Sequence, residues 1–252
     1  MFDYSDWVNL VSFIIIGTGL IVFALLFYIQ APYGKFFRKG WGPSIRSDWA
    51  WMLMELPSPV LMTLFFFTAE EKSLVKWLFL LFWLSHYLYR TFIYSVIQGG
   101  KEKPYPMLVA GMAFIFNIMN GFVNGYGVFR MNVYSADWLY TSQFITGLAL
   151  FLTGFYINKQ ADLLFRQMRK SSPREYIIPR GWLFNYVSSP HYFGEIIQWS
   201  GWALMTFSLP GLAFAVFTFG NLFPRAIASH EWYRRNFPEY PADRKAVIPF
   251  II

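Results

Sequence analysis

The sequence predicts an all-α polytopic membrane protein with seven transmembrane helices, its N-terminus outside and its C-terminus in the cytoplasm. Of its residues, 56% are apolar and only 14% are charged, against roughly 25% charged in an average soluble domain. Apolar stretches long enough to cross a bilayer recur along the chain, with short charged connections between them. The connections also differ in charge between the two sides. We expect a single integral-membrane domain over residues 1–252.

The seven apolar stretches can be placed in order. Val8 to Ile29 is an uncharged run that is too long for a signal-peptide core, so we interpret it as a retained first helix. The others lie at about 49–68, 73–97, 106–123, 138–157, 190–208 and 212–229. Glu55, Pro57 and Pro59 interrupt the second stretch, which favours a broken helix that lines a cavity.

The charge of the connections predicts the orientation. Seven spans place the segments 31–48, 98–105, 158–181 and the tail from 230 on one side, and these hold 16 of the 21 Lys and Arg. The N-terminus, 68–72 and 124–137 lie on the other side and hold two. Because Lys and Arg collect on the cytoplasmic side, the first set is predicted to face the cytoplasm.

Ionisable residues within the spans are costly and mark candidate sites. Glu55 is interpreted as a hydrogen-bonding or acid group in a buried pocket, with a structural pair to Arg90 as the alternative. His86, Tyr87, Arg90 and Tyr94 share one face of a helix by their spacing. That face is either a packing stripe or, with Glu55 from a neighbouring helix, a donor site for a carbonyl oxygen.

A second candidate site follows the fifth span. Asn158, Asp162, Arg166 and Arg169 share a helix face. A solvated amphipathic helix is the common explanation of such a run. The alternative is an anion site, where Arg binds phosphate while Asp and Asn accept hydrogen bonds from ribose hydroxyls or adenine. The more distant Arg225, Tyr233 and Arg244 would add to such a site.

His191 and Glu195 lie four residues apart in the sixth span, and therefore on one helix face. A metal site is not expected, because the chain has no Cys and only three His, without metal-ligand spacing. Gly17-Thr18-Gly19 lies within an apolar helix, so it is no Rossmann fingerprint, and a P-loop is absent too. Any nucleotide must bind within the bundle itself.

Taken together, these residues resemble the steroid 5α-reductase family over nearly the whole chain. The likeness is strongest over Gly154–Ile252, and related membrane reductases and isoprenylcysteine methyltransferases look similar there. The N-terminal motifs narrow the choice among these families to the steroid 5α-reductases. The matching pieces include Glu55-Leu56-Pro57-Ser58, His86-Tyr87-x-x-Arg90-Thr91-Phe92, Lys103-Pro104-Tyr105-Pro106, Asn158-x-x-x-Asp162-x-x-x-Arg166-x-x-Arg169-Lys170, Phe193-Gly194-Glu195, and Arg244-Lys245-Ala246-Val247-Ile248-Pro249-Phe250-Ile251.

The resemblance implies NADPH as hydride donor and a 3-oxo-Δ4-steroid as acceptor. By the match, Glu55 and Tyr87 hold the 3-oxo group. Hydride adds to steroid C5, Tyr87 donates to the carbonyl oxygen, and Glu55 either donates when protonated or orients Tyr87 when ionised. The positions that match cofactor contacts are Lys103, Asn158, Asp162, Arg169, Tyr176, Glu195, Tyr233 and Arg244. His191 departs from the family, since the vertebrate enzyme has Asn there, and we expect it to replace that Asn as a polar contact to the cofactor.

Other functions stay open at this point. A related reductase would act on a polyprenol or an enoyl thioester, a methyltransferase would use S-adenosylmethionine, and a transporter or receptor would be no enzyme at all. The expected partners are a sterol-like lipid, NADPH and the bilayer, with no nucleic acid, and we expect a monomer. The membrane would be the endoplasmic reticulum in a eukaryote and the inner membrane in a bacterium.

Overall fold

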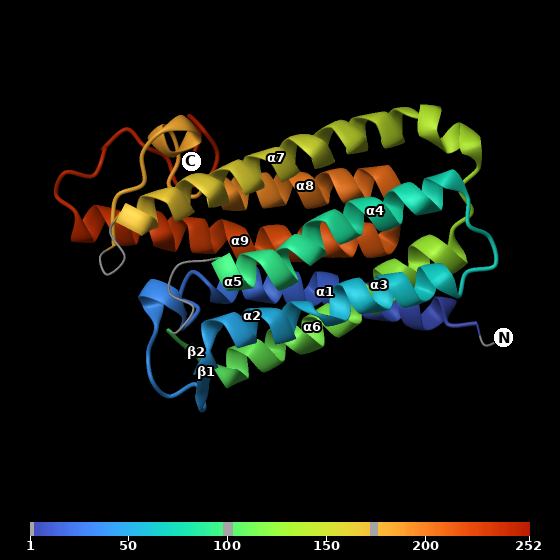
Figure 1. The fold of residues 1–252 in the computed structure, drawn as a ribbon, viewed down its shortest axis with the longest axis horizontal. Helices are drawn as coiled ribbons and strands as arrows, with labels where there is room; N and C mark the ends of the chain where they lie inside the picture. Colours follow the sequence, from blue (N-terminus) through green and yellow to red (C-terminus); the bar gives the residue numbers. More distant parts are fainter. Residues whose placement is uncertain (1–2, 98–102, 172–175) are drawn as a thin grey trace.

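The computed structural model describes residues 3–97, 103–171 and 176–252, so the predicted basic connections 98–105 and 158–181 lie partly outside the described residues. Helices account for most of the fold and run along one long axis (Figure 1). Their bounds are α1 Ser5–Leu25, α2 Ser47–Glu55, α3 Pro57–Phe67, α4 Leu74–Leu88, α5 Ser95–Ile97, α6 Met107–Tyr126, α7 Ser142–Ser171, α8 Pro190–Thr206 and α9 Leu209–Asn236.

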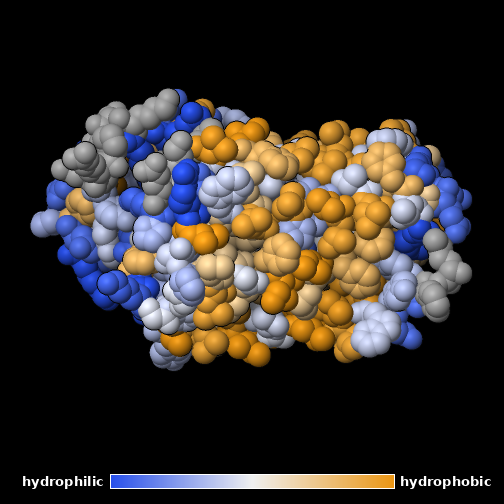
Figure 2. Space-filling model, turned by 60° about the horizontal axis from the view of Figure 1, so that its bottom comes forward, coloured by the Kyte–Doolittle hydropathy of each residue, from blue (hydrophilic) through white to orange (hydrophobic). Residues whose placement is uncertain are grey.

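Among the described residues, four helical segments are long and apolar enough to cross a membrane: Ser5–Leu25, Ser47–Phe67, Met107–Met131 and Leu209–Asn236. The rod from α4 to α5, the first part of α7, and α8 coincide with the other three predicted spans and run beside these four (Figure 1). On the face shown in Figure 2, apolar residues cover the middle of the molecule and hydrophilic residues lie toward both ends. These features agree with a membrane protein, while the count of seven spans and the orientation stay predictions.

Several helix boundaries differ from the predicted ones for local reasons. α2 and α3 run nearly in line, because Leu56 between them keeps α-helical torsion angles and Pro57 occupies the first position of α3, where a missing N–H does no harm. The interruption expected from Glu55, Pro57 and Pro59 is therefore confined to Leu56 between the two helices. α7 continues to Ser171 and α9 to Asn236, well past their apolar stretches, as amphipathic extensions with many polar residues.

A short β-ribbon, which was not predicted from the sequence, joins two distant connections. β1 (Ser44–Arg46) pairs antiparallel with β2 (Pro104–Pro106). The ribbon lies at the same end of the bundle as the C-terminus and the segment 176–189, opposite the N-terminus (Figure 1). It therefore places Lys103 at the end where the predicted basic segments meet.

α7 and α8 pack closely along a row of glycines. A Cβ added to Gly154 would lie 2.3 Å from the backbone N of Gln198, and one added to Gly194 would lie 2.5 Å from the backbone N of Asn158. Gly147 and Gly201 make equally close contacts one heptad away. Because no larger side chain fits between the backbones, polar groups of α7 can reach α8 directly.

Candidate active site

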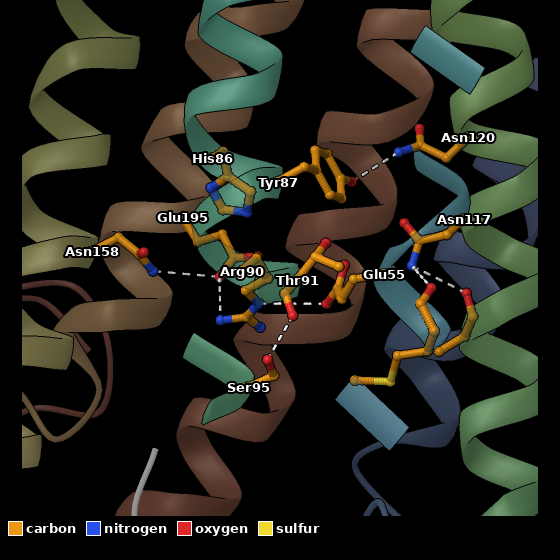
Figure 3. Close-up of polar contacts among 12 residues, drawn as sticks. Glu55, His86, Tyr87, Arg90, Thr91, Ser95, Asn117, Asn120, Asn158 and Glu195 are labelled. Carbon is orange, nitrogen blue, oxygen red and sulfur yellow. Dashed lines mark hydrogen bonds and ion pairs between the residues drawn. The ribbon is translucent and has the colours of Figure 1, made fainter. Parts of the chain in front are cut away.

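Arg90 connects the two predicted sites. Its Nε lies 3.5 Å from Oε1 of Glu55, and its Nη1 lies 4.0 Å from Oε2 of Glu195 (Figure 3). All three side chains are largely shielded, with exposed fractions of 12–14%. A buried guanidinium between two carboxylates is a compact charge cluster in which each carboxylate has a partner. The structural pair of Glu55 with Arg90 is therefore present, and it lies inside the candidate site.

A π-helical turn positions this arginine. The α4 helix gives way to a π-helix at Tyr89–Tyr94 before α5. Such turns insert an extra residue into the helical repeat and often occur at functional sites. The residues predicted to share one face, His86, Tyr87, Arg90 and Tyr94, contact different neighbours. His86 contacts Gln198 on α8, Tyr87 contacts Asn120 on α6, and Arg90 stacks over the rings of Trp51 and Tyr94.

Tyr87 lies in an aromatic environment next to Glu55 and Arg90 (Figure 3). Its ring stacks on Trp83 with 5.0 Å between centroids and lies 5.8 Å from Trp199. The hydroxyl oxygen accepts a hydrogen bond of 3.3 Å from Nδ2 of Asn120. The phenol is thus buried together with other polar side chains, Ser58, Asn117 and Asn120 among them. Because water is excluded there, a hydrogen bond to a ligand is stronger than in water.

Asn158 joins His191 to Glu195 across the α7–α8 contact. Its Nδ2 donates to the backbone O of His191 at 3.0 Å and to Oε2 of Glu195 at 3.4 Å. The two residues of α8 that share a face are therefore connected through a third residue rather than directly. The close glycine packing at Gly154 and Gly194 makes this reach possible.

A polar cavity of about 230 Å³ opens beside this cluster, at the β-ribbon end of the bundle. Five cationic side chains contribute to its wall, from the first connection, the π-helical turn, the residue before β2, α7 and α9. Its lining includes Lys35, Lys103, Arg169, Arg225, Asp162, Arg90, Tyr94, Tyr176, His191, Tyr192 and Tyr233. Oδ2 of Asp162 is buried and has no hydrogen-bond partner among the described residues. A cavity of this kind suits an anionic ligand that also carries hydroxyl or amino donors.

Lys35 belongs to this wall, although the sequence analysis did not single it out. Its Nζ donates to Oγ of Ser229 at 2.6 Å and lies 4.1 Å above the ring of Tyr233. Burial, together with the nearby charge of Arg169, lowers the pKa of Lys35 to about 7. Burial also lowers the pKa of Lys103, again with Arg169 contributing. Its position in a basic connection that is predicted to be cytoplasmic was the sequence signal for Lys35.

The predicted cofactor residues fall into three groups. Seven of them line the cavity: Lys103, Asp162, Arg169, Tyr176, His191, Arg225 and Tyr233. Asn158 and Glu195 lie behind it, in the hydrogen-bonded cluster around Arg90. Arg244 is placed differently. It donates to the backbone O of Pro179 at 3.0 Å and so fastens the C-terminal tail to the segment that precedes α8.

An apolar groove of about 510 Å³ lies on the outer surface between α3 and α4. It is lined by Leu56, Pro59, Val60, Thr63, Leu64, Phe67, Leu84, Leu88 and Phe92. Leu56 directly follows Glu55, and Leu88 directly follows Tyr87. No ionisable residue lines the groove, in contrast to the polar cluster and its cavity.

Fold and site together define a helical membrane protein with a buried ionic cluster between an aromatic interior and a cationic cavity. Comparison with known proteins gives the family. A family profile described as 3-oxo-5-alpha-steroid 4-dehydrogenase matches residues 103–252. The chain is 42% identical over 238 residues to the steroid 5-alpha-reductase DET2 of Arabidopsis thaliana, with 90% of each chain covered.

It is also 39% identical over 240 residues to the 3-oxo-5-alpha-steroid 4-dehydrogenase 1 of Bos taurus, covering 93% of each chain. For the Homo sapiens protein of the same name, identity is 38% over 239 residues. The chain belongs to the steroid 5α-reductase family, so it is an oxidoreductase that acts on a CH–CH bond. The resemblance seen in the sequence is confirmed.

Proposed function

We propose that this protein reduces the Δ4 double bond of 3-oxo-Δ4-steroids with NADPH, giving 5α-reduced 3-oxosteroids. The observation that carries the proposal is the position of Arg90, which contacts Glu55 on one side and Glu195 on the other. Glu55 and Tyr87 would hold the substrate carbonyl on one side of this arginine. The cationic cavity would hold the anionic cofactor on the other side, so the two ligands would meet at Arg90.

The residues of the cavity fit a phosphorylated dinucleotide. Lys35, Lys103 and Arg225 supply positive charge for phosphates from three separate elements. The buried, unpartnered Oδ2 of Asp162 is an acceptor that awaits a donor such as a ribose hydroxyl or an amino group. When bound, the nicotinamide cofactor would supply the hydride for the double bond.

The chain's own residues stabilise charge at the carbonyl. Reduction of the conjugated double bond at C5 moves negative charge onto the 3-oxo oxygen. Tyr87 would donate its phenolic hydrogen to that oxygen, an interaction that strengthens as the charge develops. Glu55 would either donate as an acid or orient Tyr87, and solvent would supply the proton at C4. Arg90 fixes the carboxylate of Glu55 through their ion pair.

The apolar body of the steroid needs a path from the lipid. The groove between α3 and α4 adjoins the residues that follow Glu55 and Tyr87, and its apolar lining suits a sterol skeleton. We propose this face as the side from which the substrate approaches. In the same way, one integral-membrane domain with seven spans, working as a monomer, stays our prediction.

The test is NADPH oxidation by the purified protein in detergent or nanodiscs, with testosterone or progesterone as acceptor. We expect steroid-dependent oxidation, and expect a polyprenol or an enoyl thioester to give far less. Oxidation with one of those instead would support the related reductases. No oxidation with any enone, while the protein stays folded, would overturn the enzymatic proposal.

A further inference from the structure

A chain of buried polar side chains runs from α8 through α6 to Tyr87, and we infer that it makes Asn120 a positioning residue for the reaction. This inference rests on the proposed role of Tyr87. Asn120 would fix the phenol oxygen as a hydrogen-bond acceptor and so leave its O–H free for the substrate carbonyl. Asn124 and Trp202 would set the orientation of Asn120.

Three consecutive side-chain hydrogen bonds connect Trp202 to Tyr87. Nε1 of Trp202 donates to Oδ1 of Asn124 at 2.9 Å, and Nδ2 of Asn124 donates to Oδ1 of Asn120 at 2.9 Å. Nδ2 of Asn120 then donates to the hydroxyl oxygen of Tyr87 at 3.3 Å. Asn120, Asn124 and Trp202 are fully buried, and Tyr87 is 3% exposed. Solvent therefore does not compete for these bonds.

Trp202, the first residue of this series, determines which atom donates and which accepts in every hydrogen bond of the series. An indole N–H can only donate, so the group of Asn124 that faces Trp202 must be its carbonyl oxygen. The amide of Asn124 then points the other way, where it meets Oδ1 and the backbone O of Asn120 and the backbone O of Pro210. All three are acceptors, which agrees with that orientation.

Asn120 is oriented in turn. Because its Oδ1 accepts from Asn124, its NH₂ group faces Tyr87, and an NH₂ group cannot accept. The hydroxyl of Tyr87 therefore receives a hydrogen bond at its oxygen and must direct its own hydrogen elsewhere. Successive donors in a dry interior also polarise one another, which makes the last O–H a stronger donor.

A structural role is the competing explanation, since Asn side chains commonly hold membrane helices together. The two roles make different predictions for Asn120→Asp. A carboxyl group keeps the shape and polarity but offers an acceptor to Tyr87, which would then donate to residue 120 and not to the substrate. Positioning thus predicts a larger loss of turnover for Asn120→Asp than for Asn120→Leu, whereas helix packing predicts the reverse.

The decisive experiment is a double-mutant cycle on steroid turnover in purified protein. We expect Asn120→Leu to lower kcat about tenfold, the scale of one hydrogen bond to a group that gains charge, with KM little changed. In a Tyr87→Phe background, the same substitution should change kcat less than about twofold, because the hydroxyl that Asn120 contacts is gone. Equal losses in both backgrounds, or a smaller loss for Asn120→Asp than for Asn120→Leu, would overturn the inference.

Matched indole variants keep the test independent of folding. Trp202→Phe removes the N–H donor that orients Asn124 and, through it, Asn120. It should lower kcat in the wild-type background but not in the Tyr87→Phe background. Trp138→Phe removes an indole that donates to the backbone O of Met205 at 3.0 Å, away from the chain, and should leave kcat unchanged. If Tyr87→Phe alone keeps wild-type turnover, the proposed role of Tyr87 fails. If Tyr87→Phe lowers turnover but the effects of Tyr87→Phe and Asn120→Leu simply add, Tyr87 keeps its proposed role and only the positioning role of Asn120 fails.

Discussion

The guanidinium Nε of Arg90 lies 3.5 Å from the carboxylate of Glu55, deep between α2 and the π-helical turn. The same guanidinium is 4.0 Å from Glu195 on α8. One side chain thus joins the residue proposed to hold a carbonyl to a residue beside the cationic cavity. The consequences of this arrangement can be tested by substitution.

Arg90→Lys tests the need for two contacts at once. A lysine ammonium is a single point charge and cannot serve two carboxylates in fixed directions as a guanidinium does. We expect kcat to fall at least about tenfold. Arg90→Ala leaves buried carboxylates without their partner and should lower the free energy of unfolding by about 3–5 kcal/mol. Turnover and thermal unfolding measure these effects, and an Arg90→Lys enzyme with full activity would refute the bridging role.

Glu55→Gln and Tyr87→Phe test the two residues that we propose to hold the substrate carbonyl. Each variant should lose most turnover, because the group that stabilises charge on the carbonyl oxygen is removed or altered. NADPH affinity should survive, since neither side chain lines the cavity. Titration of intrinsic fluorescence with NADPH and steady-state kinetics separate the two quantities. Wild-type rates in either variant would show that its residue was wrongly assigned.

Lys35 predicts a pH dependence of cofactor binding. With a pKa of about 7, Lys35 is cationic below pH 7 and mostly neutral above it. An anionic ligand prefers the cation and raises this pKa when it binds. NADPH affinity should therefore weaken as pH rises above about 7, by at most about tenfold per pH unit. Binding isotherms between pH 6 and 9 measure the effect.

Lys35→Arg provides the control, because a guanidinium keeps its charge throughout this range. Its affinity profile should be flatter than that of the wild type, and the ligand's own titration is the same for both proteins. Identical profiles would show that Lys35 takes no part in binding the cofactor.

The glycine row between α7 and α8 predicts a stability effect. Gly154→Ala would bring a Cβ to 2.3 Å from the backbone N of Gln198, so the helices must separate. Such overpacking should cost about 1–3 kcal/mol and weaken the Asn158–Glu195 contact. Gly111→Ala on α6 is the matched control, because its Cβ would meet nothing within 4 Å. Equal melting temperatures for the two variants would contradict the packing described here.

The sequence was most informative where the membrane makes polarity costly. Polar residues within apolar spans are costly to bury, and this identified Glu55, Tyr87 and Glu195. The structure places these three residues in one region (Figure 3). The charge balance of the connections also identified which segments meet at one end of the bundle. These signals depend only on local composition and on the cost of burying charge.

Other features depend on contacts between distant residues and were beyond the sequence. Lys35 and Ser229 form a hydrogen bond across 194 positions, and apart from the basic character of the segment around Lys35 nothing local predicts this contact. The orientation of Asn120 follows from Trp202 through Asn124, which only the packed bundle shows. The β-ribbon was hidden because each strand has three residues, and β2 begins and ends with proline.

The most direct test follows the transferred hydrogen. Purified protein is given NADPH that carries deuterium at the hydride position, with testosterone as the acceptor, and the product is analysed by mass spectrometry and NMR. We expect one deuterium at C5, on the α face, in a 3-oxosteroid whose C4–C5 bond is saturated. Deuterium at C3 with the double bond intact, or label at C5 on the β face, would contradict the proposed reaction.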